Sequence, residues 1–284
     1  MAAIAFGLLS SLLWGVSDYL GGVKSRAFPV PVVLAMMYLS SLAVMLLVVA
    51  ARGAPPPPAE NVLAGLGSGL VGIAGLSAFY RALAIGTMSI VAPIASTGVA
   101  LPVIVGLIGG DDPGQVRSAG LALAVAGIVL ASREAADEAA VTGRRQRLSI
   151  LLAIVAGLGF GSYFVLAEIA SAGDVAWALL LSRASALPII AAIALLVLRR
   201  GGARPRARGL AVLAGIGLLD LGANFFYNYA STIGELSSVA VASSLYPVTT
   251  VMLAALLLGE RVQGVQRIGV VTALAGVVLI AAGG

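Results

Sequence analysis

Long apolar blocks run through the whole chain, and only short polar connectors separate them. Because a helix crosses a bilayer core about 30 Å thick with about 20 mostly apolar residues, each block is long enough to span a membrane. The pattern predicts ten spans, at residues 3–22, 30–51, 61–82, 88–108, 114–132, 148–170, 175–198, 208–230, 236–258 and 264–282. We therefore expect an all-α integral membrane protein with ten transmembrane helices.

The two halves of the chain resemble each other. Gly110-Asp111 matches Gly259-Glu260 at a spacing of 149 residues, and Phe79-Tyr80 matches Phe226-Tyr227 at a spacing of 147. These matches predict two related units of five helices. Because five is odd, the second unit is expected to be inverted relative to the first. Inverted repeats with a site at their interface are typical of secondary transporters; gene duplication in a structural membrane protein is the alternative.

The expected boundaries follow the polar segments. Residues 1–132 form the first five-helix repeat, residues 133–147 a polar connector, and residues 148–284 the second repeat. The N-terminal stretch lacks the basic region of a signal peptide, so we expect it to remain as the first span.

Composition supports lipid as the solvent. Hydrophobic residues make up 60% of the chain and charged residues 10%, against about 45–50% and about 25% in soluble domains. The net charge of +5 comes from residues between the apolar blocks, so nucleic acid is not an expected partner. The absence of cysteine and histidine argues against a metal site, a cofactor or a catalytic nucleophile, and hence against an intramembrane enzyme.

The basic residues predict the orientation. Fourteen Lys and Arg residues lie in connectors on one side of the predicted bundle, and only Arg52 and Arg117 lie on the other. Since cytoplasmic loops are enriched in Lys and Arg, we expect the basic side in the cytoplasm and both termini outside. The protein is then a multi-pass protein of a bacterial-type inner or plasma membrane.

Four charged residues fall within the predicted spans: Asp18, Glu168, Arg183 and Asp220. A charge at the bilayer centre costs about 2.5–3.5 kcal/mol or more, so such residues are candidates for function. Glu168 lies near a span end, where an interfacial position is expected. Arg183 either receives a substrate carboxylate or pairs with Asp220 or Asp18, because an unpaired buried charge is not tolerated.

Asp220 is the deepest of the four. Asn224 and Asn228 follow at i+4 and i+8, so the three side chains are predicted to share one helix face, with Tyr227 beside it. A carboxylate and two amides in one cavity could hold an ammonium group, which makes Asp220 a candidate for cation binding or proton coupling. The alternative is a hydrogen-bond network that only clamps helices.

Trp14 and Asp18 are four residues apart and share a face, which predicts an aromatic wall beside an anion. The alternative is an interfacial position, because Trp favours the headgroup region and Asp18 lies only six residues before Lys24.

Proline predicts helix breaks in corresponding places of the two halves. Pro247 comes with Ser243, Ser244 and Tyr246, and Pro93 supplies the counterpart in the first half. Matched breaks point to the binding region; plain packing kinks are the alternative. We expect the cavity between spans one, three, four, six, eight and nine.

The glycines are spaced for helix contacts. Gly67–Gly72 matches the dinucleotide pattern GxGxxG, but it lies within an apolar span and follows no strand, so we reject a nucleotide site. Gly65 and Gly69, like Gly157 and Gly161, instead predict close contacts between helices.

Several short motifs together indicate a family. They are Ser10-Ser11-Leu12-Leu13-Trp14-Gly15, the Pro247 segment closed by Leu258-Gly259-Glu260-Arg261, and the run from Ile268-Gly269-Val270 to Gly276-Val277-Val278-Leu279. With these motifs the whole chain resembles the EamA-type ten-helix exporters of the drug/metabolite transporter (DMT) superfamily. The resemblance implies export of amino acids or related small metabolites, often in exchange for protons. It also implies cytoplasmic termini, against the charge count, which we follow for this chain.

The first repeat departs from the closing motif, with Gly109-Gly110-Asp111-Asp112 in its place. Glu260-Arg261 lies at a connector, so we expect a structural role for it, either turn closure or pairing with Arg267.

These patterns predict a secondary active transporter that exports a small metabolite such as an amino acid by alternating access, with proton coupling through Asp220. The alternative is an uncoupled facilitator or exchanger in which Asp220 is permanently paired with Arg183. The expected partners are a small-molecule substrate, protons and the lipid bilayer, and the protein is expected to be a monomer or homodimer.

Overall fold

The computed structural model describes residues 1–110, 114–116, 118–123, 125–127, 130, 144–260 and 264–282, and within these ranges the chain forms helices and no strand. The elements are α1 (Ala2–Ala27), α2 (Val30–Arg52), α3 (Ala59–Ile85), α4 (Met88–Ser96), the 3-10 turn η1 (Thr97–Val99), α5 (Ala100–Gly109), α7 (Arg144–Gly173), α8 (Val175–Arg199), α9 (Ala207–Ile233), α10 (Leu236–Ser243), α11 (Tyr246–Leu258) and α12 (Gly264–Ala282). Within this part of the chain, eight segments are long and apolar enough to cross a membrane. An all-α, multi-pass membrane protein is thus confirmed, whereas the predicted span 114–132 extends beyond the described residues and the count of ten stays a prediction.

Two predicted spans are broken near their middle. Span 88–108 consists of α4, η1 and α5, and span 236–258 consists of α10 and α11 with Ser244 and Leu245 between them. Pro93 lies inside α4, and Pro247 lies in the first turn of α11, where its missing N–H costs no helical hydrogen bond. The structure therefore places a break near each of the two prolines.

The distribution of polar and apolar side chains is the reverse of that in a soluble protein. Large apolar side chains face outward, among them Leu47 (71% exposed), Leu256 (73%) and Ile108 (82%), whereas Asp220 and Arg183 are buried. An apolar surface of this extent is unfavourable in water but matches the hydrocarbon core of a bilayer.

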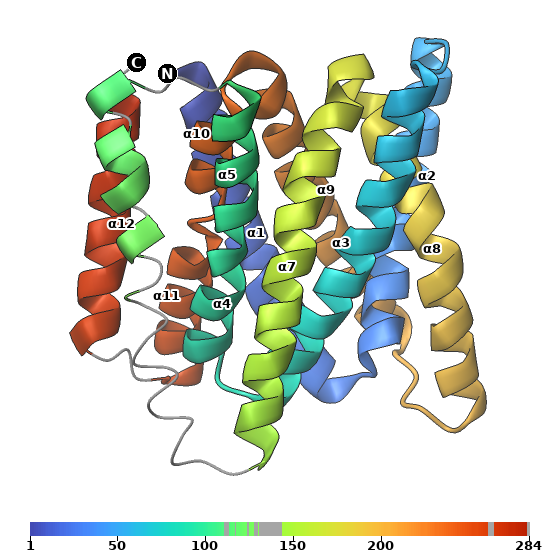
Figure 1. The fold of residues 1–284 in the computed structure, drawn as a ribbon. Helices are drawn as coiled ribbons and strands as arrows, with labels where there is room; N and C mark the ends of the chain where they lie inside the picture. The colour runs from blue at the N-terminus through green and yellow to red at the C-terminus, as the bar shows by residue number, and fades with distance from the viewer. Residues whose placement is uncertain are drawn as a thin grey trace.

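The two halves interlock and run in opposite directions. Figure 1 shows α4 below α5 but α10 above α11, so the two broken spans cross the bundle in opposite senses. They also lie side by side, because α4 packs on α11 and α5 packs on α10. The most extensive helix contacts are α3 with α7 and α1 with α9. Each of these contacts pairs the third helix of one repeat with the first helix of the other, as expected for a pseudo-two-fold arrangement.

Two tyrosines show the relation between the halves in detail. Tyr80 Oη donates a hydrogen bond to the carbonyl oxygen of Ser17 (3.4 Å), and Tyr227 Oη donates one to the carbonyl oxygen of Phe164 (2.9 Å). The same 147 residues separate the two tyrosines and the two acceptors. Each bond joins the third helix of a repeat to its first helix.

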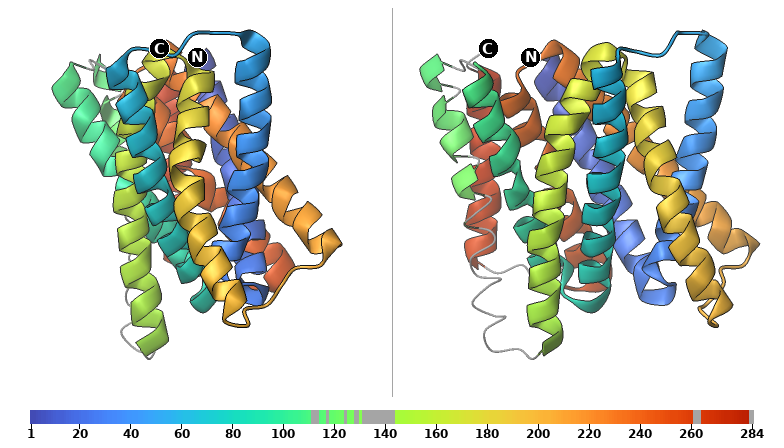
Figure 2. Two further views of the ribbon diagram at one scale, coloured as in Figure 1. Left: turned by 90° about the vertical axis from the view of Figure 1, so that its right-hand side faces the viewer. Right: turned by 45° about the vertical axis from the view of Figure 1, so that its right-hand side comes forward.

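The two ends of the bundle differ in charge. α1 begins and α12 ends at one end, and the α1–α2, α3–α4 and α8–α9 connections lie at the other, together with the start of α7 (Figures 1 and 2). The helix ends and connections at that second end carry Lys24, Arg26, Arg81, Arg144, Arg145, Arg147, Arg199, Arg200, Arg204, Arg206 and Arg208.

Arg52, at the end of α2, pairs with Asp174, the residue before α8. Its two terminal nitrogens donate to the two carboxylate oxygens at 2.9 and 2.7 Å. This hydrogen bonding lowers the pKa of Asp174 below its usual value. The pair links α2 of the first repeat to α8 of the second.

Candidate functional site

A cavity of about 50 Å³ lies between the two repeats. It has room for only a few water molecules and is far smaller than a site that encloses a drug-sized ligand. Its wall is formed by Trp14, Asp18, Tyr38, Gly72, Leu76, Phe160, Tyr163, Phe164, Arg183, Asp220, Asn224 and Tyr246. These residues come from α1, α2, α3, α7, α8, α9 and α11. The prediction missed the second and seventh spans, which supply Tyr38 and Arg183, and the fourth span that it included contributes no wall residue.

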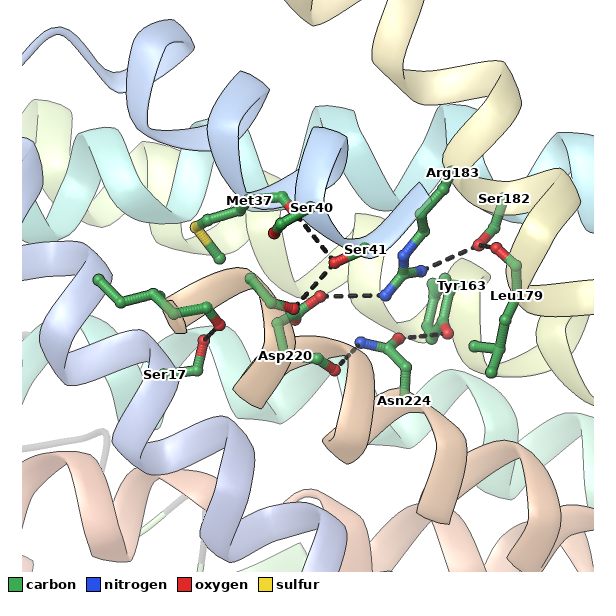
Figure 3. Close-up of polar contacts among 12 residues, drawn as sticks. Ser17, Met37, Ser40, Ser41, Tyr163, Leu179, Ser182, Arg183, Asp220 and Asn224 are labelled. Atoms are coloured by element: carbon green, nitrogen blue, oxygen red, sulfur yellow. Dashed lines mark hydrogen bonds and ion pairs between the residues drawn. The ribbon is translucent and has the colours of Figure 1, made fainter. Parts of the chain in front are cut away.

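Asp220 and Arg183 form a buried ion pair in the cavity wall (Figure 3). Arg183 Nη2 donates to Asp220 Oδ2 at 3.0 Å, and Arg183 Nη1 donates to Ser182 Oγ at 2.9 Å. The guanidinium carbon lies 5.3 Å from the ring centroid of Tyr38, within cation–π range. Of the alternatives for Arg183, the structure shows pairing with Asp220. The guanidinium is therefore engaged with Asp220 and Ser182, while its Nε–H is buried without an acceptor among the described residues.

Asn224 fixes α7 against α9 beside this ion pair. Its Nδ2 donates to the carbonyl oxygen of Asp220 at 2.6 Å, and Tyr163 Oη donates to its Oδ1 (Figure 3). Both ends of the amide are thus engaged within the protein. This geometry is that of the helix clamp, although the side chain also lines the cavity.

Asp18 is the one wall carboxyl group without a counterion. Its residue is 5% exposed and lines the cavity one helical turn from Trp14. Among the described residues no hydrogen bond or ion pair engages its carboxyl group. The charged side chain that interacts with it electrostatically is Asp220, which is also an acid and therefore repels it when both are ionised. The structure therefore places Asp18 in the cavity wall and not at an interface.

Comparison with known proteins assigns this arrangement to a family. The sequence matches the EamA-like transporter family over residues 1–133 and 147–282. The chain belongs to this family. A solved structure titled "Crystal structure of protein" has the same fold, with a TM-score of 0.69 and 18% sequence identity over 99% of this chain and 97% of that one. A search of curated proteins found no match.

Two residues predicted for the site of this EamA-like chain lie behind the cavity wall. Tyr227 is fully buried, its hydroxyl group bonds to the Phe164 carbonyl, and its ring packs against Trp14 and Phe164 at centroid distances of 5.8 and 4.7 Å. Asn228 is 2% exposed and does not line the cavity. The stripe predicted from Asp220 therefore reaches the cavity only as far as Asn224.

The hydroxyl groups near the second helix break differ in whether they line the cavity. Ser243 and Ser244 are buried beside the break and do not line the cavity. Tyr246 does line it, and its Oη is buried without a hydrogen-bond partner in the described part of the chain. Pro93 and Pro247 do not line the cavity, and each lies in a helix next to one of the two breaks.

Most of the aromatic side chains of the EamA-like cavity were not predicted from the sequence. Tyr38, Tyr163, Phe160 and Phe164 line it, in addition to the predicted Trp14 and Tyr246. Alignment of the repeats at α2 and α8 could have found Tyr38, because it places Tyr38 at the position that Arg183 has in the second repeat.

Two hydrogen bonds support this alignment. Ser40 Oγ donates to the Ala214 carbonyl, and Ser185 Oγ donates in the same way to the Leu66 carbonyl. The same 145 residues separate Ser40 from Ser185 and Tyr38 from Arg183.

Glu260 of the family motif caps a helix of the other repeat. Its carboxylate accepts hydrogen bonds from the backbone N–H groups of Met88 (3.4 Å) and Ser89 (3.1 Å) at the start of α4, and it lies 3.4 Å from Arg26 Nη2. The residue before α4 supplies no side-chain cap of its own. A carboxylate at a helix N-terminus satisfies free N–H groups and is favoured by the helix dipole. The predicted structural role is confirmed.

The partners of Glu260 differ from the predicted one, because it pairs with α4 and Arg26 rather than with Arg267. Arg261, Asp111 and Asp112 lie outside the described residues.

Loss of this cap is expected to weaken the fold. We expect Glu260→Ala to lower the free energy of unfolding by about 0.5–2 kcal/mol, because two N–H groups of α4 lose their acceptor. Arg26→Ala is the control and should have a smaller effect, since Arg26 is partly exposed and contacts the same carboxylate. Denaturant titration in detergent micelles measures both. Equal stability of Glu260→Ala and the unchanged protein would contradict the capping role.

Proposed function

We propose that this chain is a secondary active transporter with ten transmembrane helices, arranged as two inverted five-helix repeats, that exports small metabolites such as amino acids by alternating access. The observation that carries the proposal is the cavity between oppositely directed halves, with Asp18, Asp220 and Arg183 in its wall. Charged groups within membrane spans are retained where they face a cavity or a substrate path, and inverted repeats place such a site at their interface. We take residues 1–132 and 148–284 as the repeats and residues 133–147 as the connector.

The broken spans supply the moving parts. The half-helices α4 and α11 pack together, as do α5 and α10, so each end of the bundle has its own pair. Separation of one pair opens the cavity to one side while the other pair keeps it closed. The cavity of about 50 Å³ is the contracted stage of this cycle, and a metabolite enters when one pair moves apart.

Proton coupling requires a carboxyl group that can gain and lose a proton. Asp220 is held 3.0 Å from Arg183, and this guanidinium favours the charged form of the carboxyl group. Asp18 faces the cavity and has no such partner in the described part of the chain. We therefore assign proton exchange to Asp18 and give the Asp220–Arg183 pair a role in holding α8 against α9.

Flux measurements in proteoliposomes test this function. Radiolabelled amino acids and amines are expected to accumulate against their gradients when a pH gradient is imposed, and Asp18→Asn should lose this accumulation. If Asp18→Asn keeps it and Asp220→Asn loses it, Asp220 is the coupling group. Flux that ignores both pH and voltage would favour the uncoupled facilitator, and no flux of any metabolite would contradict transport.

We also propose that both termini lie on the side of the membrane opposite the cytoplasm. The basic residues gather at the end of the bundle opposite the start of α1 (Figure 1), and cytoplasmic loops carry the excess of Lys and Arg. A C-terminal fusion to a reporter that is active only in the cytoplasm should therefore be silent. A bright signal would refute this orientation.

A further inference from the structure

The charges in the cavity wall do not cancel. Asp18 and Asp220 supply two carboxyl groups, and Arg183 supplies one guanidinium. The guanidinium is committed to Asp220 at 3.0 Å. An ionised Asp18, 5% exposed, then leaves one negative charge without a partner. Because a buried charge is strongly unfavourable when unpaired, the ionised state of this cavity requires one positive charge from outside the protein.

The surroundings of Asp18 favour an organic cation over a metal ion. The rings of Trp14 and Phe164 lie 5.7 Å apart, and those of Phe160 and Tyr246 lie 6.3 Å apart, all in the cavity wall. Aromatic faces attract ammonium groups, whereas hard metal ions need several oxygen ligands. Within the described residues no group of three acidic, His or Cys side chains is arranged to hold a metal ion.

Tyr246 provides a second polar contact. Its Oη is buried, lines the cavity, and has no hydrogen-bond partner among the described residues. A phenolic oxygen can accept a hydrogen bond. The cavity wall therefore offers an ammonium group two oxygen acceptors without a partner among the described residues, one on Asp18 and one on Tyr246.

We propose that this cavity selects a small monovalent organic cation of the alkylammonium class in preference to zwitterionic or anionic metabolites. The ammonium group binds Asp18 and Tyr246, and the apolar body lies against the rings of Trp14, Phe160 and Phe164. The inference rests on the proposed function, because it names the substrate class of the same site. It narrows the small metabolites proposed there to amines without a carboxyl group, in place of amino acids.

A carboxylate on the ligand would oppose binding. The two terminal nitrogens of Arg183 donate to Asp220 and Ser182, and its Nε is buried without contact to any described acceptor. Although the unpaired Nε–H could donate to a ligand carboxylate, that carboxylate would be a third negative group beside a single guanidinium that is already paired with Asp220. An amino acid is therefore expected to bind more weakly than the amine that lacks its carboxyl group.

Four probes with nearly the same branched skeleton separate these possibilities: isobutylamine (a cation), valine (a zwitterion), isobutanol (neutral) and isobutyrate (an anion). Each is titrated calorimetrically into the purified, full-length protein in detergent at mildly alkaline pH. We expect isobutylamine to bind about tenfold or more tightly than isobutanol, which has no charge for ion pairing or cation–π contact. The same margin is expected over valine, whose ammonium group is accompanied by a carboxylate that the two acidic residues of the wall repel. Isobutyrate is expected not to bind.

Asp18→Asn should remove the preference for isobutylamine over isobutanol. This substitution keeps the shape of the side chain and removes a charge without a partner, so the variant is expected to fold, which thermal unfolding checks. Glu60→Gln is the matched control: it removes an acid at the exposed start of α3, outside the cavity, and should leave the preference unchanged.

Equal affinity for isobutanol, tighter binding of valine or isobutyrate, absence of isobutylamine binding, or a preference that survives in Asp18→Asn would each overturn the inference. These outcomes concern binding only. Failure of the transporter assignment would appear separately, as absence of metabolite flux in proteoliposomes.

Discussion

The Arg183→Met variant is expected to lose about 3–5 kcal/mol of the free energy of unfolding. Arg183 is 2% exposed, and its guanidinium supplies the positive charge opposite Asp220. Methionine fills similar space but leaves the Asp220 carboxylate buried without a counterion. Desolvation of that carboxylate is then no longer offset by ion pairing. Denaturant titration in detergent micelles measures the loss.

A double variant separates the ion pair from packing. Arg183→Met combined with Asp220→Leu removes both charges and should recover most of the lost stability, because a buried ion pair and an apolar pair of similar volume are often about equally stable. Arg52→Met, at the partly exposed pair with Asp174, should cost much less than Arg183→Met. A single Arg183→Met variant as stable as the unchanged protein would contradict a structural role for the buried pair.

Gly161→Leu is expected to be the second strongly destabilising substitution. A Cβ atom on Gly161 would overlap the carbonyl oxygen of Gly98 and approach Leu101 Cβ at 3.0 Å. Gly98 belongs to η1, so the clash is with the backbone of the helix break and cannot be relieved by a side-chain rotation. Overpacking of this kind costs about 1–3 kcal/mol, occasionally more.

Gly215→Leu on α9 is the matched control, because a Cβ there meets nothing within 4 Å. It should leave the stability unchanged or raise it slightly, since glycine is unfavourable in a helix interior. Thermal unfolding in the same detergent compares the two variants. Equal effects of Gly161→Leu and Gly215→Leu would show that the contact between η1 and α7 contributes nothing.

Much of the fold could be predicted, because a helix that spans a membrane needs a long run of apolar residues, which is visible in the sequence. The breaks near Pro93 and Pro247 were also predictable, since proline removes a hydrogen bond inside a helix and is favoured in the first turn of a new one. The glycine contacts followed from residue size: Cβ atoms on Gly65 and Gly69 would meet Leu181 and the Ser182 backbone. These features depend on local chemistry alone.

The site could be predicted only in part, because it depends on which helix faces meet. Asp18, Asp220 and Arg183 were found by their depth, but their pairing was left open until the helices were placed. Each step of four residues turns about 40° beyond a full helical turn. Asn228 therefore lies about 80° around α9 from Asp220, behind the wall.

We propose that the cavity between the two repeats opens to each side of the membrane in turn. The chain contains no cysteine, so Leu76→Cys introduces a single thiol in the cavity wall. A charged, membrane-impermeant maleimide is added from the outside or from the inside of oriented vesicles, and modification of the thiol is followed over time. Alternating access predicts modification from either side. Modification from one side only, or from neither, would contradict it.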